Sequence, residues 1–289
     1  MPVLGGKRTL ERATLRWRAS SFRSGRDLLA VEEPLEIRLA GRRFTVTMRT
    51  PGHDEELVAG FLFTEGFVNA ANEIGEIRRV RGSTGKPEAN VIDVILHVPV
   101  EDLRERLQRN FAMTSSCGLC GKTSIEAIER RIAPLSRGNA GLQASVLMGL
   151  SAKMRSEQTI FAATGGVHAA ALFDRSGALH VLREDIGRHN AVDKLVGWAM
   201  GRNSLPLADS LVMVSGRLSF EIVQKVAAAG APLLAAVSAP SSLAVELADQ
   251  VGITLLGFLR DGAFNLYTHP ERVTGPACGG TEPPGSHSK

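Results

Sequence analysis

The run LVMVSGRLSFEIVQKVAAAGAPLLAAVSAPSSLAVELADQVGITLLGF, residues 211–258, decides the fold class of this chain. Its apolar segments that are short enough to be buried strands are residues 211–214, 232–237 and 253–258. Residues 219–229 and 243–251, which lie between them, have the length and spacing of helices. Strand, helix, strand, helix, strand predicts parallel pairing with right-handed crossovers. The C-terminal half is therefore expected to be a βαβαβ unit.

In the residues that precede this unit, alternating apolar and polar residues predict three hairpins. They fall at residues 35–48 around Gly41, at 76–81 with 91–98, and at 167–173 with 178–183. Helices are predicted after Pro51, where acidic residues fill a first turn, and over 141–156. The expected architecture is α/β, with a mixed, partly parallel sheet and an N-terminal lobe rich in β-hairpins. Four segments are expected. Residues 1–26 form a basic disordered tail and residues 27–112 a β-rich lobe. Residues 113–273 form an α/β core that makes one functional unit with this lobe, and residues 274–289 form a second disordered tail.

Composition excludes several function classes. The chain of 289 residues is 44% hydrophobic and 22% charged, which is ordinary for a globular protein. The net charge of +4 is concentrated near the N-terminus, but aromatic residues are not interleaved with the basic ones, so no nucleic-acid partner is expected. No apolar stretch is long enough to span a bilayer, and the arginine-rich N-terminus lacks the apolar core of a secretory signal. We expect a cytoplasmic protein with no membrane partner.

Three cysteines are too few for a disulfide framework, which indicates a reducing compartment. Cys117 and Cys120 lie close together in TSSCGLCGK (114–122), whereas Cys278 lies in a tail rich in glycine and proline and is taken as incidental. In such a pair one thiol can be held as thiolate while the other resolves whatever the first binds. Lys122 and the start of a helix near Thr123 would both favour a thiolate.

Two rival interpretations of the cysteine pair stay open at this point. A zinc site needs three or four ligands, so His168 or His189 would have to complete it. A thioredoxin-type redox pair usually opens a helix after the first strand of a small domain, whereas this pair lies in the middle of the chain. Spacing alone favours sulfur or redox chemistry over zinc.

Polar residues follow each predicted parallel strand, where ligands bind in open α/β sheets. These residues are Ser215-Gly216-Arg217, the run 238–242, and the run 258–262. Small hydroxylic residues, glycines and arginines suit a phosphate-bearing ligand, although no Walker or GxGxxG sequence names a nucleotide. Two further candidates are His168, behind two glycines, and the polar cluster with Arg188 and His189 at the start of a helix, where Asn190 is the expected N-cap.

Taken together, these runs resemble the formate dehydrogenase accessory sulfurtransferase family. The matching segments are RTPGHDEELVAGFLFTEG (49–66), SSCGLCGK (115–122), TGGVHAAALF (164–173), REDIGRHNAVDK (183–194), VSGRLSFEIVQK (214–225) and GFLRDGAFNLYTHPERV (257–273). The resemblance implies a cytidine-deaminase-like α/β core without deaminase chemistry. A zinc deaminase carries a glutamate two residues after its ligand histidine, whereas His168 is followed by Ala169 and Ala170.

The resemblance also implies a function. A cysteine desulfurase would load sulfur onto Cys117 as a persulfide, and the sulfur would pass to the molybdenum cofactor, bis-molybdopterin guanine dinucleotide, destined for formate dehydrogenase. Cys120 would assist the transfer or resolve the persulfide, and no resident metal is expected. The run implied to bind the cofactor is Phe258, Leu259, Arg260, Asp261, Gly262 and Ala263. The alternative is a non-catalytic chaperone for the cofactor, and the apolar core leaves room for a homodimer.

Overall fold

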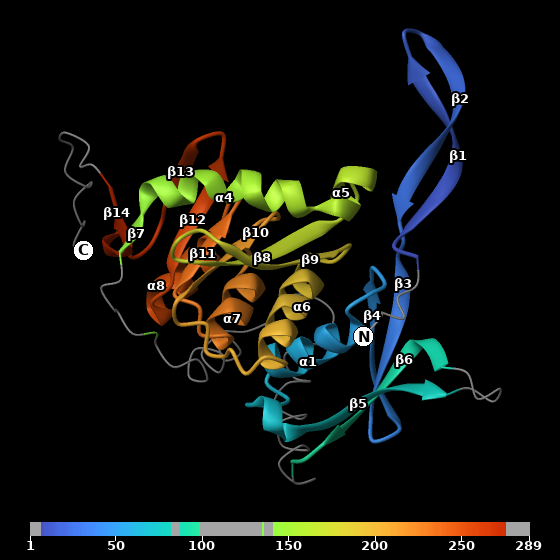
Figure 1. Cartoon of the computed structure of the whole chain (residues 1–289), viewed down its shortest axis with the longest axis horizontal. Coiled ribbons are helices and arrows are strands. Elements are labelled where there is room, and N and C mark those ends of the chain that lie inside the picture. Colours follow the sequence, from blue (N-terminus) through green and yellow to red (C-terminus); the bar gives the residue numbers. More distant parts are fainter. Residues whose placement is uncertain (1–6, 82–86, 99–134, 136–140, 276–289) are drawn as a thin grey trace.

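The computed structural model describes residues 7–81, 87–98, 135 and 141–275. Within them, a large sheet covered by helices on both faces lies beside a smaller N-terminal lobe, and a long hairpin projects from their junction (Figure 1). None of the described helices is long and apolar enough to cross a membrane.

The large sheet has the strand order β13-β12-β11-β10-β8-β9. Its strands are β8 (His168–Asp174), β9 (Leu179–Asp185), β10 (Ser210–Val214), β11 (Leu233–Ala236), β12 (Thr254–Arg260) and β13 (Ala263–Leu266). Strands β10, β11 and β12 are parallel, whereas β8, β9 and β13 pair antiparallel with their neighbours. Helices α7 (Phe220–Ala228) and α8 (Ser242–Val251) make the two crossovers. The predicted mixed, partly parallel sheet is therefore confirmed.

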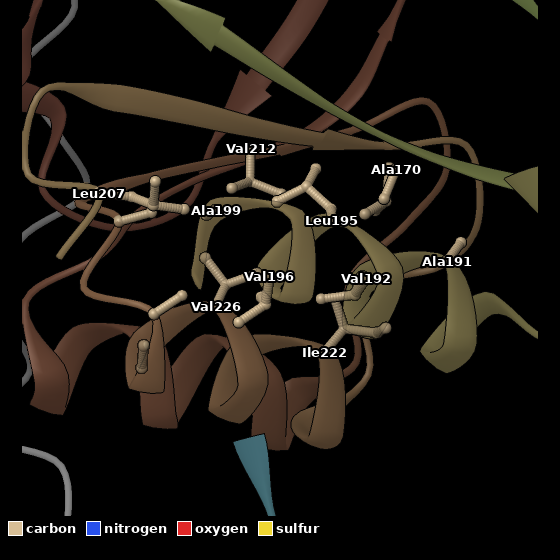
Figure 2. Close-up of a cluster of buried hydrophobic side chains, with 14 of the residues drawn as sticks. Ala170, Ala191, Val192, Leu195, Val196, Ala199, Leu207, Val212, Ile222 and Val226 are labelled. Atoms are coloured by element: carbon tan, nitrogen blue, oxygen red, sulfur yellow. The ribbon is translucent and has the colours of Figure 1, made fainter. Parts of the chain in front are cut away.

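Alternate residues of the central strands pack against different helix layers. Leu211 and Met213 of β10 belong to a core shared with α4 (Ala144–Glu157), which is followed by α5 (Thr159–Thr164). Val212 belongs to the core shared with α6 (Arg188–Met200), α7 and α8, where Leu195 lies next to it (Figure 2). Both faces are buried, which explains why these strands are continuous apolar runs.

The N-terminal lobe is a four-stranded sheet of order β4-β3-β6-β5. Its strands are β3 (Glu33–Leu39), β4 (Arg42–Arg49), β5 (Ile74–Arg81) and β6 (Pro87–Leu96). Helix α1 (Asp54–Thr64) leaves the lobe and packs against α6, so that both parts share one core (Figure 1). Smaller elements complete the described chain, namely η1 (Ala71–Glu73), η2 (Pro270–Arg272) and the paired strands β7 (Leu142–Gln143) and β14 (Val273–Thr274).

The N-terminal residues differ from the predicted disordered tail over 1–26. From Thr9 onward they form the projecting hairpin of β1 (Thr9–Arg18) and β2 (Ser21–Ala30). Ala19 and Ser20 both have positive φ, as a two-residue hairpin turn requires. Arginines crowd both strands and hide the alternation in the sequence, but Trp17 and Phe22 stack edge to face at 4.8 Å beside that turn. The predicted C-terminal tail lies outside the described residues, except for Thr274 and Gly275.

Candidate functional site

A cavity of about 830 Å³ opens between the large sheet and the helix pair α4–α5. From the sheet and its loops it is lined by Gly165, Gly166, Val167, His168, Ser215, Val237, Arg260, Asp261 and Gly262. From the helix pair it is lined by Met148, Ser151, Ala152, Met154, Arg155, Gln158 and Phe161. The structure therefore brings His168, Ser215, Arg260, Asp261 and Gly262, all predicted binding residues, around one space.

The topology explains why these loops meet. Strands β10, β11 and β12 are parallel, so their carboxyl ends, with Ser215, Val237 and Arg260, reach the same edge of the sheet. Strand β8 runs the opposite way and begins at this edge with His168. Ser215 ties the strand ends together, because its N–H donates to the Ala169 carbonyl and its Oγ accepts from the Ala169 N–H, both at 2.9 Å.

The run 258–263 leaves regular strand geometry. A bulge separates Gly257 from Arg260, and Phe258 (φ 56°) and Asp261 (φ 52°) both have left-handed backbone. Such a conformation is rare for a bulky residue such as phenylalanine, and strained residues of this kind cluster at functional sites. The exposed side chains of Arg260 and Asp261, which follow the bulge, line the cavity. There Nε of Arg260 lies 4.0 Å from Oδ2 of Asp261.

Not every residue of this run faces the cavity. The Leu259 side chain is buried in the core between the sheet and α4. Phe258 and Ala263 are partly or fully exposed and do not line the cavity. Leu259 therefore anchors the loop, and Arg260 to Gly262 form its cavity-facing part.

His168 lines the cavity, and the pKa of its ring is lowered from its ordinary value. Burial lowers the pKa of its ring, and the charge of nearby Arg188 lowers it further. A Cβ atom at Gly216 would lie 3.3 Å from Nδ1 of His168, so any side chain there would crowd the ring. Gly216 is thus adjacent to the His168 ring but does not line the cavity.

Arg217, Arg188 and His189 do not line the cavity. Arg217 is exposed, and Arg188 and His189 open helix α6 behind Gly216. The N-cap of α6 is Gly187, which corrects the expected cap at Asn190. Among the described residues, the buried Nε of Arg188 and Nε2 of His189 have no hydrogen-bond partner. Burial, together with Arg188 and Lys225, lowers the pKa of His189 to about 4.

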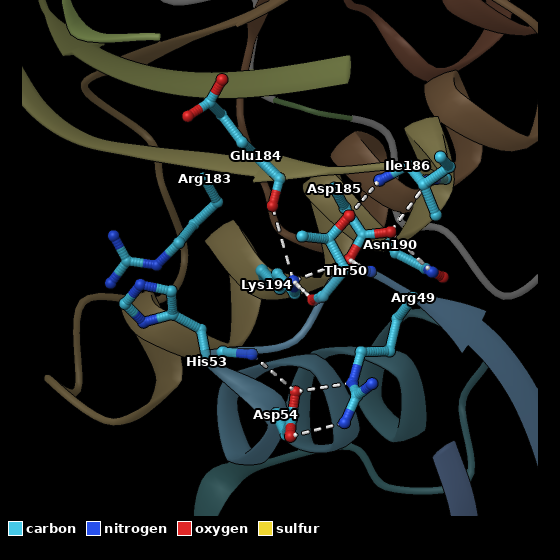
Figure 3. Close-up of polar contacts among 12 residues, drawn as sticks. Arg49, Thr50, His53, Asp54, Arg183, Glu184, Asp185, Ile186, Asn190 and Lys194 are labelled. Atoms are coloured by element: carbon cyan, nitrogen blue, oxygen red, sulfur yellow. Dashed lines mark hydrogen bonds and ion pairs between the residues drawn. The ribbon is translucent and has the colours of Figure 1, made fainter. Parts of the chain in front are cut away.

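The motifs at residues 49–54 and 183–194 meet in a buried polar junction (Figure 3). Arg49, 1% exposed, donates from Nε and Nη2 to the carboxylate of Asp54 at 3.0 and 3.2 Å. Lys194 lies 2.6 Å from Oδ2 of Asp185, and its Nζ also donates to the Thr50 carbonyl at 2.9 Å. None of these residues lines the cavity, although Asp185 pairs with His168 across strands β8 and β9, and the contacts join the N-terminal lobe to the core.

A further ion pair extends this junction. Arg183 donates from both Nε and Nη2 to the carboxylate of Glu56 on α1. Burial disfavours the charge on Glu56, but hydrogen bonds from Arg183 and His53 outweigh it and lower its pKa to about 2. Within the polar cluster over 183–190, Arg183 and Asp185 therefore connect the two parts, and the functional role predicted for the cluster stays a prediction.

Cys117, Cys120 and Cys278 lie outside the described residues, so the zinc and redox alternatives for the cysteine pair stay open. The helix pair α4–α5 supplies cavity residues that the sequence did not single out, among them Arg155, Gln158 and Phe161. Arg155 lies in the predicted helix over 141–156, whereas Gln158 and Phe161 follow its predicted end, and no sequence pattern marks the three as cavity residues.

Fold and site together define a mixed α/β protein with a ligand-sized cavity at the carboxyl ends of parallel strands. Comparison with known proteins places it further: residues 30–274 match the FdhD/NarQ family, and the chain belongs to that family. The match begins at Ala30, so all but the last residue of the projecting hairpin precedes it.

Individual relatives agree with this assignment. A protein of Mycobacterium tuberculosis named sulfur carrier protein FdhD is 52% identical over 255 residues, covering 86% of this chain and 92% of its own length. A protein of the same name from Nocardia farcinica is 46% identical over 279 residues, covering 96% of this chain and 99% of its own. A crystal structure of a protein assigned as a formate dehydrogenase accessory protein, from Desulfotalea psychrophila, superimposes with a TM-score of 0.71 at 28% identity. That superposition covers 93% of this chain and 100% of the other.

Proposed function

We propose that this chain carries sulfur from a cysteine desulfurase to the molybdenum cofactor before the cofactor enters formate dehydrogenase. The observation that carries the proposal is the cavity where Arg260, Ser215 and His168 meet at the carboxyl ends of the parallel strands. The relatives named sulfur carrier proteins support the sulfur chemistry, and the neighbour assigned as a formate dehydrogenase accessory protein supports the recipient.

The sulfur chemistry is assigned to Cys117. Its thiolate attacks the terminal sulfur of the desulfurase persulfide, the donor's S–S bond breaks, and the donor leaves as a thiolate. Delivery returns Cys117 to a thiolate, and the acceptor supplies the two electrons that reduce the transferred sulfur to sulfide. Cys120 either assists this delivery or attacks Cys117, which expels sulfide and leaves a disulfide.

The acceptor, bis-molybdopterin guanine dinucleotide, is assigned to the cavity as a substrate. Its pyrophosphates require cations and small polar groups, and Arg260, Ser215 and the glycines at 165 and 166 supply them. Arg260 is half-exposed and its pair with Asp261 is loose, so its donors are available to a phosphate. The volume of about 830 Å³ falls within the range usual for sites that hold small molecules and cofactors.

Hydrolytic deamination does not fit these residues. Ala169 and Ala170, which follow His168, are buried at 2% and 0% exposure in strand β8 and carry no proton-transfer group. The cytidine-deaminase-like description of the core, the cytoplasmic location, a homodimer and the absence of a resident metal stay predictions of the sequence.

Intact-mass spectrometry tests the proposal. After incubation with a cysteine desulfurase and cysteine, the protein should gain the mass of one sulfur atom, which a reducing agent removes, and Cys117→Ala should abolish the gain. Cys120→Ser is the matched control, expected to load sulfur but to deliver it poorly. A chaperone without sulfur chemistry would still activate formate dehydrogenase after both cysteines are replaced, and that result would reject the sulfur-carrier proposal.

A further inference from the structure

The outer half of the projecting hairpin of β1 and β2 has one apolar face. Residues paired across two strands lie on the same face, and successive residues of a strand alternate between faces. The register pairs Trp17 with Phe22, and Leu15 lies two residues before Trp17, so these three side chains share a face. They are exposed by 65% for Leu15, 61% for Trp17 and 68% for Phe22. An apolar strip on an exposed element marks a surface that another molecule contacts.

The opposite face of the hairpin is basic. Arg16 pairs with Arg23 in the register, and Arg12 and Arg18 share their face by alternation. Arg16 lies 3.3 Å from Asp27, whereas Arg12, Arg18 and Arg23 have no ion-pair partner among the residues that the structure describes. The two strands together hold five arginines and two carboxylates, which accounts for three units of the chain's net charge of +4.

The base of the hairpin lies at the rim of the cavity. Ala30 is the last residue of β2, and a Cβ atom at Gly166 would lie 3.5 Å from its own Cβ. Gly166 lines the cavity, and β2 also packs against α5, whose Phe161 lines the cavity as well. From this point the hairpin projects beyond the rest of the described chain (Figure 1). A macromolecule bound to the hairpin would therefore lie next to the cavity.

Charge and area together favour a different protein over a second copy of this chain. Because the hairpin accounts for most of the net charge, the rest of the chain has no excess of carboxylates with which another copy could meet the arginine face. Two hairpins stacked through their apolar faces would bury little. Strands of ten residues are about 33 Å long, so one face offers about 300 Å², against about 800 Å² per partner in a stable complex. A transient contact with an acidic protein satisfies both limits.

We propose that the projecting hairpin is the docking surface for the protein that delivers the persulfide sulfur, and that this donor presents an acidic surface bordered by apolar side chains. Sulfur passes when the thiolate of one protein attacks the persulfide of the other, so the two proteins must touch during each transfer and separate afterwards. Unpaired arginines on an exposed element speed such encounters and make them depend on salt. The inference rests on the proposed function, because it assigns a surface to the cysteine desulfurase of that proposal.

Loading kinetics of the full-length protein test this assignment. Sulfur uptake is followed by intact mass with two donors: a cysteine desulfurase with cysteine, and inorganic polysulfide, which is small enough to need no docking surface. Arg18→Gln combined with Arg23→Gln should lower the second-order rate of desulfurase loading by about 10-fold at low salt and flatten its salt dependence. Trp17→Ser should lower that rate by about 10-fold at every salt concentration, as the loss of an aromatic anchor does. Loading from polysulfide should keep the wild-type rate in each variant.

A matched control removes the same charge beside another hairpin turn. Arg42 and Arg43 are exposed next to the turn between β3 and β4, and Arg42→Gln with Arg43→Gln should leave both loading rates unchanged. Because the family match begins at Ala30, the hairpin adds affinity rather than sulfur chemistry, so its variants should load slowly and not fail. Equal desulfurase rates in wild type and folded Arg18→Gln/Arg23→Gln would overturn the assignment and leave sulfur carriage intact.

Three other outcomes would also reject it. If light scattering shows a wild-type dimer that Trp17→Ser converts to a monomer while desulfurase loading is unchanged, the hairpin binds a second copy. If activation of formate dehydrogenase falls in the hairpin variants while loading keeps its rate, the hairpin contacts the recipient instead of the donor. If the wild type loads sulfur from neither donor, the proposed function fails and this inference fails with it.

Discussion

The contact between α1 and α6 depends on two glycines that let the helix backbones touch. A Cβ atom at Gly60 of α1 would overlap the backbone carbonyl oxygen of Asp193, and one at Gly197 of α6 would overlap that of Glu56. This is the main helix contact between the N-terminal lobe and the core, and both glycines have ordinary helical backbone. Replacing either by alanine therefore tests whether the two parts are joined as described.

The expected magnitude follows from two opposing effects. In an isolated helix, Gly→Ala would stabilise by about 1 kcal/mol, because alanine loses less backbone entropy on folding. At this crossing the added methyl meets a backbone carbonyl, which cannot rotate away, so the helices must move apart. Overpacking a core usually costs about 1–3 kcal/mol, and a clash with backbone belongs at or above the top of that range. Gly60→Ala and Gly197→Ala should each lower the free energy of unfolding by about 2 kcal/mol.

Denaturation in urea measures this difference, with Gly149→Ala as the matched control. Gly149 lies within α4, and no atom lies within 4 Å of the position a Cβ would take. Its replacement should therefore stabilise the protein by about 0.5–1 kcal/mol, opposite in sign to the other two. If Gly60→Ala were as stable as Gly149→Ala, the close packing of α1 on α6 would be refuted.

Two further predictions concern buried charges. Lys225 is 4% exposed, and its Nζ contacts Asp193 at 3.0 Å and Glu65 at 2.6 Å, so Lys225→Met should cost about 3–5 kcal/mol by leaving Asp193 unpaired. Adding Asp193→Asn should recover part of that loss, and a double-mutant cycle with no coupling would contradict the pairing. Burial lowers the pKa of His189 from about 6.5 to about 4, so between these values the unfolded chain binds a proton that the folded chain does not. Stability should fall as pH drops from 6.5 toward 4, and it should fall less in His189→Gln. Glu56, whose pKa is lowered to about 2, loses its contribution to stability only at lower pH. Parallel pH profiles for the two proteins would exclude the histidine.

The sheet could be predicted from the sequence because its strands are buried on both faces. Runs such as LVMV (211–214) and LLAA (233–236) admit few alternatives between helical segments, and parallel topology then places their loops at one edge. The meeting of Ser215 and Arg260 at the cavity follows from this topology alone. The spacing of residues within the motifs is not needed to predict this meeting.

The projecting hairpin and the cavity residues of helices α4 and α5 could not be predicted in the same way. In the hairpin, Trp17 and Phe22 are 61% and 68% exposed, so no core enforces the alternation by which strands are recognised. Among the cavity residues, Gln158 is buried by the joint between α4 and α5, a feature of tertiary packing rather than of spacing. The hairpin and the cavity residues of α4 and α5 are defined by the position of an element in the fold, whereas the strands of the large sheet can be recognised from their own apolar sequences.

Strand β9 shows how a motif can be structural and still control the site. Successive side chains of a strand point to opposite faces, so Arg183 and Asp185 contact the N-terminal lobe while Glu184 points the other way (Figure 3). The Glu184 carboxylate caps α5 and thereby fixes Gln158 and Phe161 at the cavity. Three consecutive residues of β9 therefore connect the buried polar junction with the N-terminal lobe to the α5 residues that line the cavity. This part of the polar cluster therefore holds in place residues that line the cavity.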